Sequence, residues 1–154
     1  MRSINAALAA VAVAMTLITS AFASDTTDVM AVVNKFNDGM NKGDVKTAAS
    51  TCAPQTFIID EFAPNVWQSN DTCTDWANAL DVYNKKNGIT NEVVTLGKPR
   101  HVDVTSDRAY VVVPAYNVFK KNGKRVVAPG SIVTLALHKV ESGWQITAWS
   151  WAQR

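Results

Sequence analysis

Asp60 is the residue whose type and surroundings most favour chemistry. It stands in the apolar segment 57–62, where strand alternation places it on the same face as Ile58 and Phe62. A carboxylate on a buried face loses hydration, so its pKa rises toward the range that suits a general acid or base. In the alternative interpretation, Asp60 is structural and accepts hydrogen bonds from N–H groups of the loop near Asn65 or Gln68. The sequence leaves both roles open.

His101 is the second residue that could move a proton. It follows the segment 98–100 in a stretch expected to be a strand, and with Asp60 it would form an Asp/His pair of the kind a cyclase or dehydratase could use. A single histidine in a strand is more often structural or exposed to solvent. His138 is assigned no role, and neither histidine has metal-ligand spacing to a cysteine. No metal, nucleotide or flavin motif is present, so the sequence predicts no cofactor.

Residues 1–23 have the pattern of a secretory signal peptide. Arg2 precedes an apolar run at 7–18, and Ala21-Phe22-Ala23 has the small-x-small pattern of a cleavage site. A membrane anchor is the alternative, but the run is short and polar residues interrupt it. We therefore expect a periplasmic or secreted single domain at 24–154, with no membrane attachment after cleavage.

The two cysteines, Cys52 and Cys73, have 20 residues between them. A disulfide closing a loop of this length would stabilise the fold by about 3 kcal/mol in the chain-entropy treatment. Two buried free thiols are the alternative. An exported protein meets an oxidising compartment, which favours the disulfide.

The charge balance argues against a nucleic-acid partner. The 154 residues include 15 Lys and Arg against 13 Asp and Glu, a net charge of +2, whereas many phosphate contacts require a strongly basic surface. The basic residues at 120–125 surround Asn122-Gly123, a pair typical of a tight hairpin turn, and indicate a solvated turn. With 47% hydrophobic residues, the chain can bury a core.

Hydrophobic spacing predicts an α+β fold in which a curved antiparallel sheet wraps around N-terminal helices. A helical period predicts helices at 29–40, 45–51 and 72–87. Alternation predicts strands at 56–62, 92–103, 108–120, 125–140 and 144–152.

Four features in this order resemble the nuclear transport factor 2-like superfamily, also called the SnoaL-like or cystatin-like cone fold. They are Asn41-Lys42-Gly43-Asp44 at the end of the first helix, the strand at 56–62, the helix beginning near Trp76, and the closing segment 143–147. The resemblance covers residues 28–152.

The resemblance implies a cone-shaped cavity that binds a small apolar or amphipathic molecule. Its expected ligand-binding residues are Phe36, Ile58, Phe62, Trp67, Trp76, Tyr83, Tyr116 and Leu135.

In the steroid isomerases of this superfamily, the position of Asp60 carries the proton-shuttling aspartate. Those enzymes stabilise an enolate with a tyrosine and a neutral aspartic acid, because the oxyanion needs preorganised donors. The matching positions here are Phe36 and Leu135, which cannot donate. Efficient enolisation is therefore not expected unless Tyr83, Tyr116, Trp67 or His101 reaches the cavity.

Tryptophans occur on both faces of the expected last strand. Alternation places Trp144 on one face and both Trp149 and Trp151 on the other. Many relatives dimerise sheet to sheet, so the resemblance implies a homodimer with Trp149 and Trp151 in its interface. In the alternative, these two residues form the core and Trp144 lies at an edge.

Three functions fit these features. The preferred one is an exported pocket protein that binds its ligand without chemistry. The second is a small cofactor-independent cyclase, dehydratase or isomerase that uses Asp60 as general base. The third is a dimeric protein-assembly module.

Overall fold

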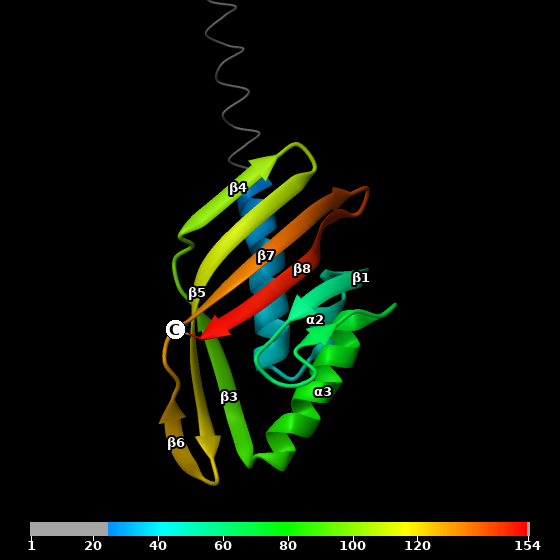
Figure 1. Cartoon of the computed structure of the whole chain (residues 1–154). Coiled ribbons are helices and arrows are strands. Elements are labelled where there is room, and N and C mark those ends of the chain that lie inside the picture. Colours follow the sequence, from blue (N-terminus) through cyan, green and yellow to red (C-terminus); the bar gives the residue numbers. More distant parts are fainter. Residues whose placement is uncertain (1–24, 154) are drawn as a thin grey trace, which may run out of the picture.

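The chain forms helices packed on one large curved sheet (Figure 1). The structure is a computed structural model that describes residues 25–153, so the predicted signal peptide at 1–23 lies outside the described residues. The elements in chain order are a helix at 25–41, α2 (Val45–Ala49), β1 (Cys52–Ile59), β2 (Val66–Trp67), α3 (Thr72–Lys86), β3 (Ile89–Leu96), β4 (His101–Thr105), β5 (Arg108–Lys121), β6 (Lys124–Val127), β7 (Ser131–Val140) and β8 (Gly143–Gln153).

Local contacts define the junction between the first two helices. The carboxylate of Asp44 accepts a hydrogen bond from the backbone N–H of Thr47 at 3.0 Å and so caps α2. The side-chain and backbone hydrogen bonds with Thr47 also lower the pKa of the exposed Asp44. At Gly39, a Cβ would lie 2.8 Å from the backbone nitrogen of Ala48, so only glycine allows this close approach. Within the described residues, no helix combines the length and apolarity needed to span a membrane.

All strands belong to one sheet, in the order β2-β1-β8-β7-β5-β3, with β4 and β6 also paired to β5. Its pairs are antiparallel except β1 with β8, which are parallel. The predicted α+β fold with a curved sheet around N-terminal helices is therefore confirmed. Two expected strands, 92–103 and 125–140, are each divided into two.

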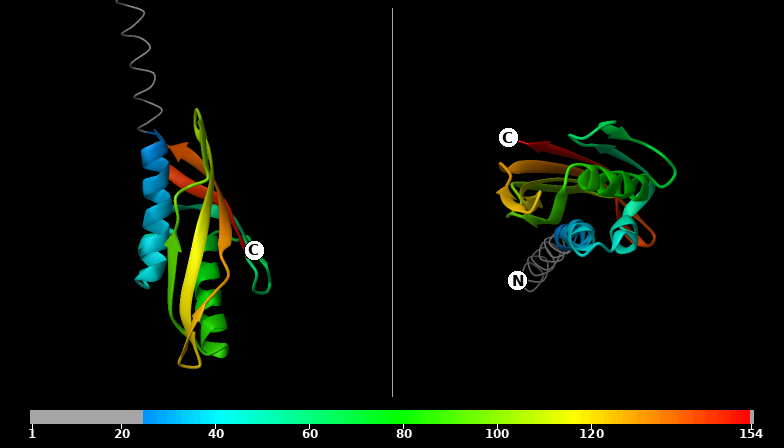
Figure 2. Two further views of the ribbon diagram at one scale, coloured as in Figure 1. Left: turned by 90° about the vertical axis from the view of Figure 1, so that its left-hand side faces the viewer. Right: turned by 90° about the horizontal axis from the view of Figure 1, so that it is seen from below.

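The break between β3 and β4 and the break between β6 and β7 have the same physical cause, and both lie opposite the middle of β5. Pro99 and Pro129 lie in the gaps, and proline cannot donate a ladder hydrogen bond. On one edge of β5, Gly97 N–H donates to the carbonyl of Pro114, and on the other edge Ala128 N–H donates to the carbonyl of Asn117. Because both neighbours break here, the long strand β5 bends, and the sheet curves toward the helices (Figure 2).

A bulge in β8 corrects the expected location of its tryptophans. Ala136 pairs with Ala148 but Leu137 pairs with Ile146, so Thr147 is an extra residue. The side-chain alternation shifts by one at this point, and Trp149 and Trp151 face the same side as Trp144. Their expected place on the convex face, in a dimer interface, is therefore wrong. A homodimer remains a prediction, but these two side chains do not support it.

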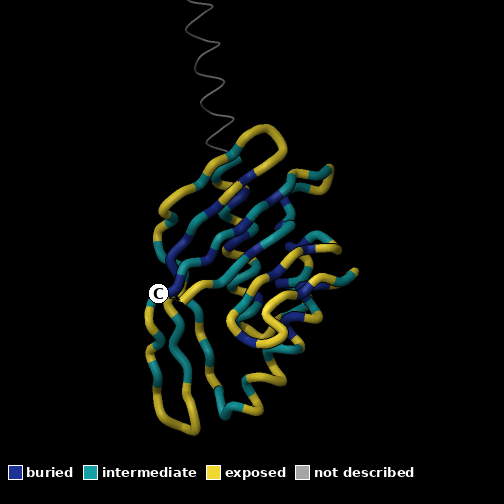
Figure 3. Tube along the Cα trace, viewed as in Figure 1, coloured by how far each residue is buried: buried dark blue, intermediate teal, exposed yellow. Residues whose placement is uncertain are grey.

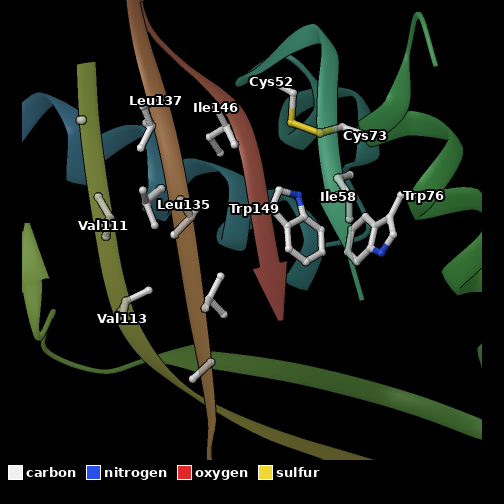
Figure 4. Packing of buried hydrophobic residues seen from close by; sticks show 14 of the residues in the cluster. Cys52, Ile58, Cys73, Trp76, Val111, Val113, Leu135, Leu137, Ile146 and Trp149 are labelled. Atoms are coloured by element: carbon white, nitrogen blue, oxygen red, sulfur yellow. A yellow bond between two sulfur atoms is a disulfide. The ribbon is translucent and has the colours of Figure 1, made fainter. Parts of the chain in front are cut away.

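The core lies between the concave face of the sheet and the helices (Figures 3 and 4). Val29 and Val33 of the first helix belong to the same buried cluster as alternate residues of β5 and β7, including Val111 and Leu137. At the other side of the core, the predicted disulfide is confirmed: Cys52 and Cys73 are bonded, with their Cα atoms 6.5 Å apart. It joins the start of β1 to the first turn of α3, and it indicates an oxidising compartment.

The first helix is also attached to the sheet by side-chain amides. Asn41 donates to the carbonyl of Val94 and accepts from its N–H, both at 2.8 Å, and Asn37 donates to the same carbonyl at 3.1 Å. Asn41 therefore satisfies two backbone groups of β3, an edge strand, as a neighbouring strand would. Hydrophobic periodicity gives no signal for this attachment.

Replacing Asn41 with alanine should destabilise the fold, because the N–H and C=O of Val94 lose a partner in a partly buried setting. We expect a loss of about 1–3 kcal/mol in the free energy of unfolding, measured by urea denaturation. Asn34→Ala, at an exposed position of the same helix, is the matched control. Equal small effects from the two variants would contradict the role assigned to Asn41.

Candidate functional site

A cavity of about 730 Å³ opens between the first helix, α3 and the concave face of the sheet. Its size is within the range of small-molecule sites. Of the residues expected to form a site, six line it. They are Phe36, Asp60, Phe62, Trp76, Tyr83 and Leu135.

The other expected site residues lie elsewhere. Ile58 is fully buried in the core, and Trp67 packs on Phe62 with 4.6 Å between ring centroids. Tyr116 is about half exposed and packs beside Gly97. None of these three lines the cavity, so the expectation that they contact a ligand there is wrong.

His101 does not pair with Asp60, which corrects the expected Asp/His pair. It is exposed on β4, with its ring centroid 6.1 Å from that of Tyr110. In the sheet, β5, β7 and β8 lie between β4 and β1, the strand that Asp60 follows. Alternation within the strand could not reveal this separation, because it depends on strand order.

Asp60 directly follows β1 and lies at the cavity wall, on the face that alternation predicts. One carboxylate oxygen accepts from the indole N–H of Trp76 at 2.9 Å, and the other accepts from the backbone N–H of Glu61 at 2.6 Å. Burial raises the pKa of Asp60, these two hydrogen bonds oppose the rise, and the nearby carboxylates of Glu61 and Glu92 add to it. Desolvation therefore dominates, and Asp60 holds its proton to a higher pH than an ordinary aspartate.

Three aromatic rings meet beside Asp60 (Figure 4 shows two of them). Trp76 and Trp149 are in edge-to-face contact with centroids 4.7 Å apart, and Phe36 lies about 6 Å from both, at 6.1 and 6.0 Å. Trp151 also lines the cavity. Sequence reasoning missed Trp149 and Trp151 as cavity residues because the bulge in β8 reverses their predicted face.

A second carboxylate in the cavity, Glu92, was not singled out from the sequence. One of its oxygens accepts from the amide of Asn117 at 2.6 Å, and the other accepts from the amide of Asn84 at 2.7 Å. Glu92 thus links α3, β3 and β5. The side-chain oxygen of Asn117 is buried and has no hydrogen-bond donor among the described residues. Within residues 25–153, no group of three or more potential ligands is arranged to hold a metal ion.

Solved structures with the same arrangement of helices and sheet decide the fold. An NTF2-like protein with a cystatin-like fold from Novosphingobium aromaticivorans superposes with a TM-score of 0.73 at 12% identity, covering 89% of this chain and 86% of the other. The chain has the nuclear transport factor 2-like fold. This confirms the resemblance inferred from the sequence at the level of the fold.

Other proteins with the nuclear transport factor 2-like fold carry names that suggest enzymes. A ketosteroid isomerase-like protein from Erwinia carotovora matches with a TM-score of 0.65 at 14% identity, over 82% of this chain and 94% of that one. A candidate dehydratase of the NTF2-like family from Streptomyces avermitilis matches with a TM-score of 0.71 at 14% identity, over 85% and 97%. The sequence itself matches no protein-family model and no curated protein. At such identities the likeness concerns the fold alone.

The raised pKa of Asp60 can be tested through Trp76. As the pH rises through the pKa of Asp60, the carboxylate that forms accepts a stronger hydrogen bond from the indole, so the indole N–H resonance of Trp76 should shift downfield. In two-dimensional NMR we expect a midpoint above that of an ordinary aspartate. Asp60→Asn should abolish the transition. The buried indole of Trp144, which has no hydrogen-bond partner among the described residues, is the internal control. A midpoint at or below the ordinary value would contradict the dominance of burial.

The sign of the linked stability change follows from the same shift. The folded state holds the proton of Asp60 more tightly than the unfolded chain. The stability that this proton contributes is fully present at pH values below the unfolded pKa and is lost as the pH rises through the folded pKa.

Proposed function

We propose that the protein binds a small amphipathic organic molecule in its cavity without converting it. The observation that carries this proposal is the cavity of about 730 Å³, whose wall combines aromatic rings and aliphatic side chains with amide and carboxylate groups. Burial of a ligand's apolar surface in such a space supplies affinity, and the polar groups orient it.

Binding without chemistry is supported by the groups around Asp60. Its two oxygens are already engaged by Trp76 and Glu61, and no histidine is among the described residues that line the cavity. Phe36 and Leu135 line the cavity but provide no hydrogen bond for a developing oxyanion. The two positions that carry the oxyanion donors in the steroid isomerases therefore carry none here, although Tyr83 lines the cavity from α3 and has a hydroxyl group.

The proposed location is outside the cytoplasm, in the periplasm or the medium. The disulfide between Cys52 and Cys73 is stable in an oxidising compartment, and the pattern at 1–23 would direct export.

The neutral fluorescent probe N-phenyl-1-naphthylamine should bind in the cavity and brighten as it leaves water. Val94 lines the cavity from β3, so Val94→Trp should fill part of the space and weaken probe binding at least about tenfold. The measurement is a fluorescence titration, with circular dichroism to confirm that each variant is folded. Native mass spectrometry of protein from its own export compartment would in addition identify a retained ligand.

Val93→Trp is the matched control. Val93 is the neighbouring residue of β3, about half exposed, and it is not part of the cavity lining. It adds the same side chain to the same strand, but on the opposite face. Loss of probe binding in both variants, or in neither, would contradict binding in the cavity.

A second candidate function is an enzyme that uses Asp60 as general base or acid. The specific observation is the raised pKa of this carboxyl at the cavity wall, which is typical of groups that transfer protons. Fold relatives with isomerase-like and dehydratase names fit such a role.

Turnover can be tested with 3-cyclohexenone, whose isomerisation to the conjugated enone is followed by ultraviolet absorbance. If Asp60 carries a proton between carbons, the rate should exceed that of buffer, and Asp60→Asn should lower it at least about hundredfold. Asp75→Asn, at an exposed position of α3 outside the cavity lining, is the control. A rate that does not change in Asp60→Asn would rule out this role.

A further inference from the structure

The cavity carries an excess of negative charge. Four carboxylates are among the described residues that line it: Asp60, Glu61, Asp81 and Glu92. No lysine, arginine or histidine is among these described lining residues. Although the whole chain has a net charge of +2, this site therefore has the opposite sign.

Three of these carboxylates lack a compensating cation in the hydrogen bonds that the structure gives them, and one of the three, the exposed Glu61, accepts from the backbone N–H of Gln153. Asp81 forms an ion pair with Lys85 at 2.6 Å. In contrast, Asp60 accepts from an indole and a backbone N–H, and Glu92 accepts from two side-chain amides. Neutral donors orient a carboxylate without cancelling its charge. The negative charges of Asp60 and Glu92 would therefore both attract a positively charged ligand in the cavity.

The pKa of Asp60 shows that grouping carboxylates in this cavity is electrostatically unfavourable. Burial raises its pKa first, and repulsion from Glu61 and Glu92 raises it further. Like charges in a partly desolvated space repel more strongly than in water. A cation entering the cavity would replace this repulsion with attraction. The buried oxygen of Asn117, which has no donor among the described residues, would contribute further negative potential.

The three aromatic rings beside Asp60, here called the aromatic wall, also favour a positively charged ligand. The rings of Phe36, Trp76 and Trp149 lie within 6.1 Å of one another beside Asp60. The faces of aromatic rings attract organic cations, most strongly when the ions are desolvated. An alkylammonium group also has an apolar surface, so it loses less hydration on entering than a metal ion would.

We propose that the ligand is an amphipathic organic cation, with its ammonium group beside Asp60 and Glu92 and its apolar body against the aromatic wall. This inference rests on the proposed function, because it names the class of ligand for the same cavity. It excludes carboxylates, sulfonates and phosphates as ligands, since no cationic side chain among the described lining residues could receive them.

Three probes of similar shape separate the effect of charge from that of size. They are benzyltrimethylammonium, its uncharged isostere neopentylbenzene, and the anion benzylsulfonate, each used to displace N-phenyl-1-naphthylamine. The cation should displace the dye at the lowest concentration, and the anion should not displace it. Equal displacement by all three, or preference for the anion, would overturn the inference but leave the pocket-binding proposal standing. Failure of the dye itself to bind would overturn both.

Variants of the carboxylates test the site directly. In Glu92→Gln, the dissociation constant of benzyltrimethylammonium relative to that of the dye should rise about tenfold, because one charge is lost while size is kept. Asp60→Asn is a second variant with the same expected direction. Glu141→Gln, at an exposed turn outside the cavity, should leave the ratio unchanged. An unchanged ratio in both cavity variants would overturn the assignment of the ammonium position.

Discussion

The division of β5 among four partner strands is the constraint on which the cavity depends. Its first half pairs with β4 and β7, and its second half pairs with β3 and β6. Because the partner strand on each side of β5 changes near the middle of β5, the sheet bends there. The bend brings β3 with Glu92 toward α3, and the space left between helices and sheet becomes the cavity.

The fold was largely predictable because it depends on periodicity, and periodicity is local. Helical spacing located all three helices, and alternation placed Asp60 on the cavity side. Alternation gives the wrong face where a bulge inserts one extra residue into a strand. The extra residue, Thr147, moves Trp149 and Trp151 to the opposite face of the sheet from the one that alternation predicts. No residue type in that strand indicates a bulge. Pro99 and Pro129 are the sequence signals of the two divided strands, because proline cannot donate a ladder hydrogen bond.

The parts of the site that sequence reasoning missed depend on contacts between distant segments. Asn41, Asn84 and Asn117 look like ordinary polar residues in the sequence, yet their amides join the first helix to β3 and link α3, β3 and β5 through Glu92. His101 shows the converse error, because a residue suited to catalysis lies across the sheet from the carboxylate it was expected to assist. Residue type indicates possible chemistry, but strand order decides which groups meet.

The disulfide makes residues 52–73 a closed covalent ring, and this ring carries Asp60 and Phe62. A single proteolytic cut within the ring would leave the two fragments joined. The opposite wall, the first helix, is attached to β3 by side-chain hydrogen bonds and apolar packing. The two walls of the cavity are therefore held in different ways, one with a covalent bond and the other by non-covalent contacts. Separating the first helix from β3 requires only that non-covalent interactions break, whereas the segment that carries Asp60 is also joined to α3 by a covalent bond.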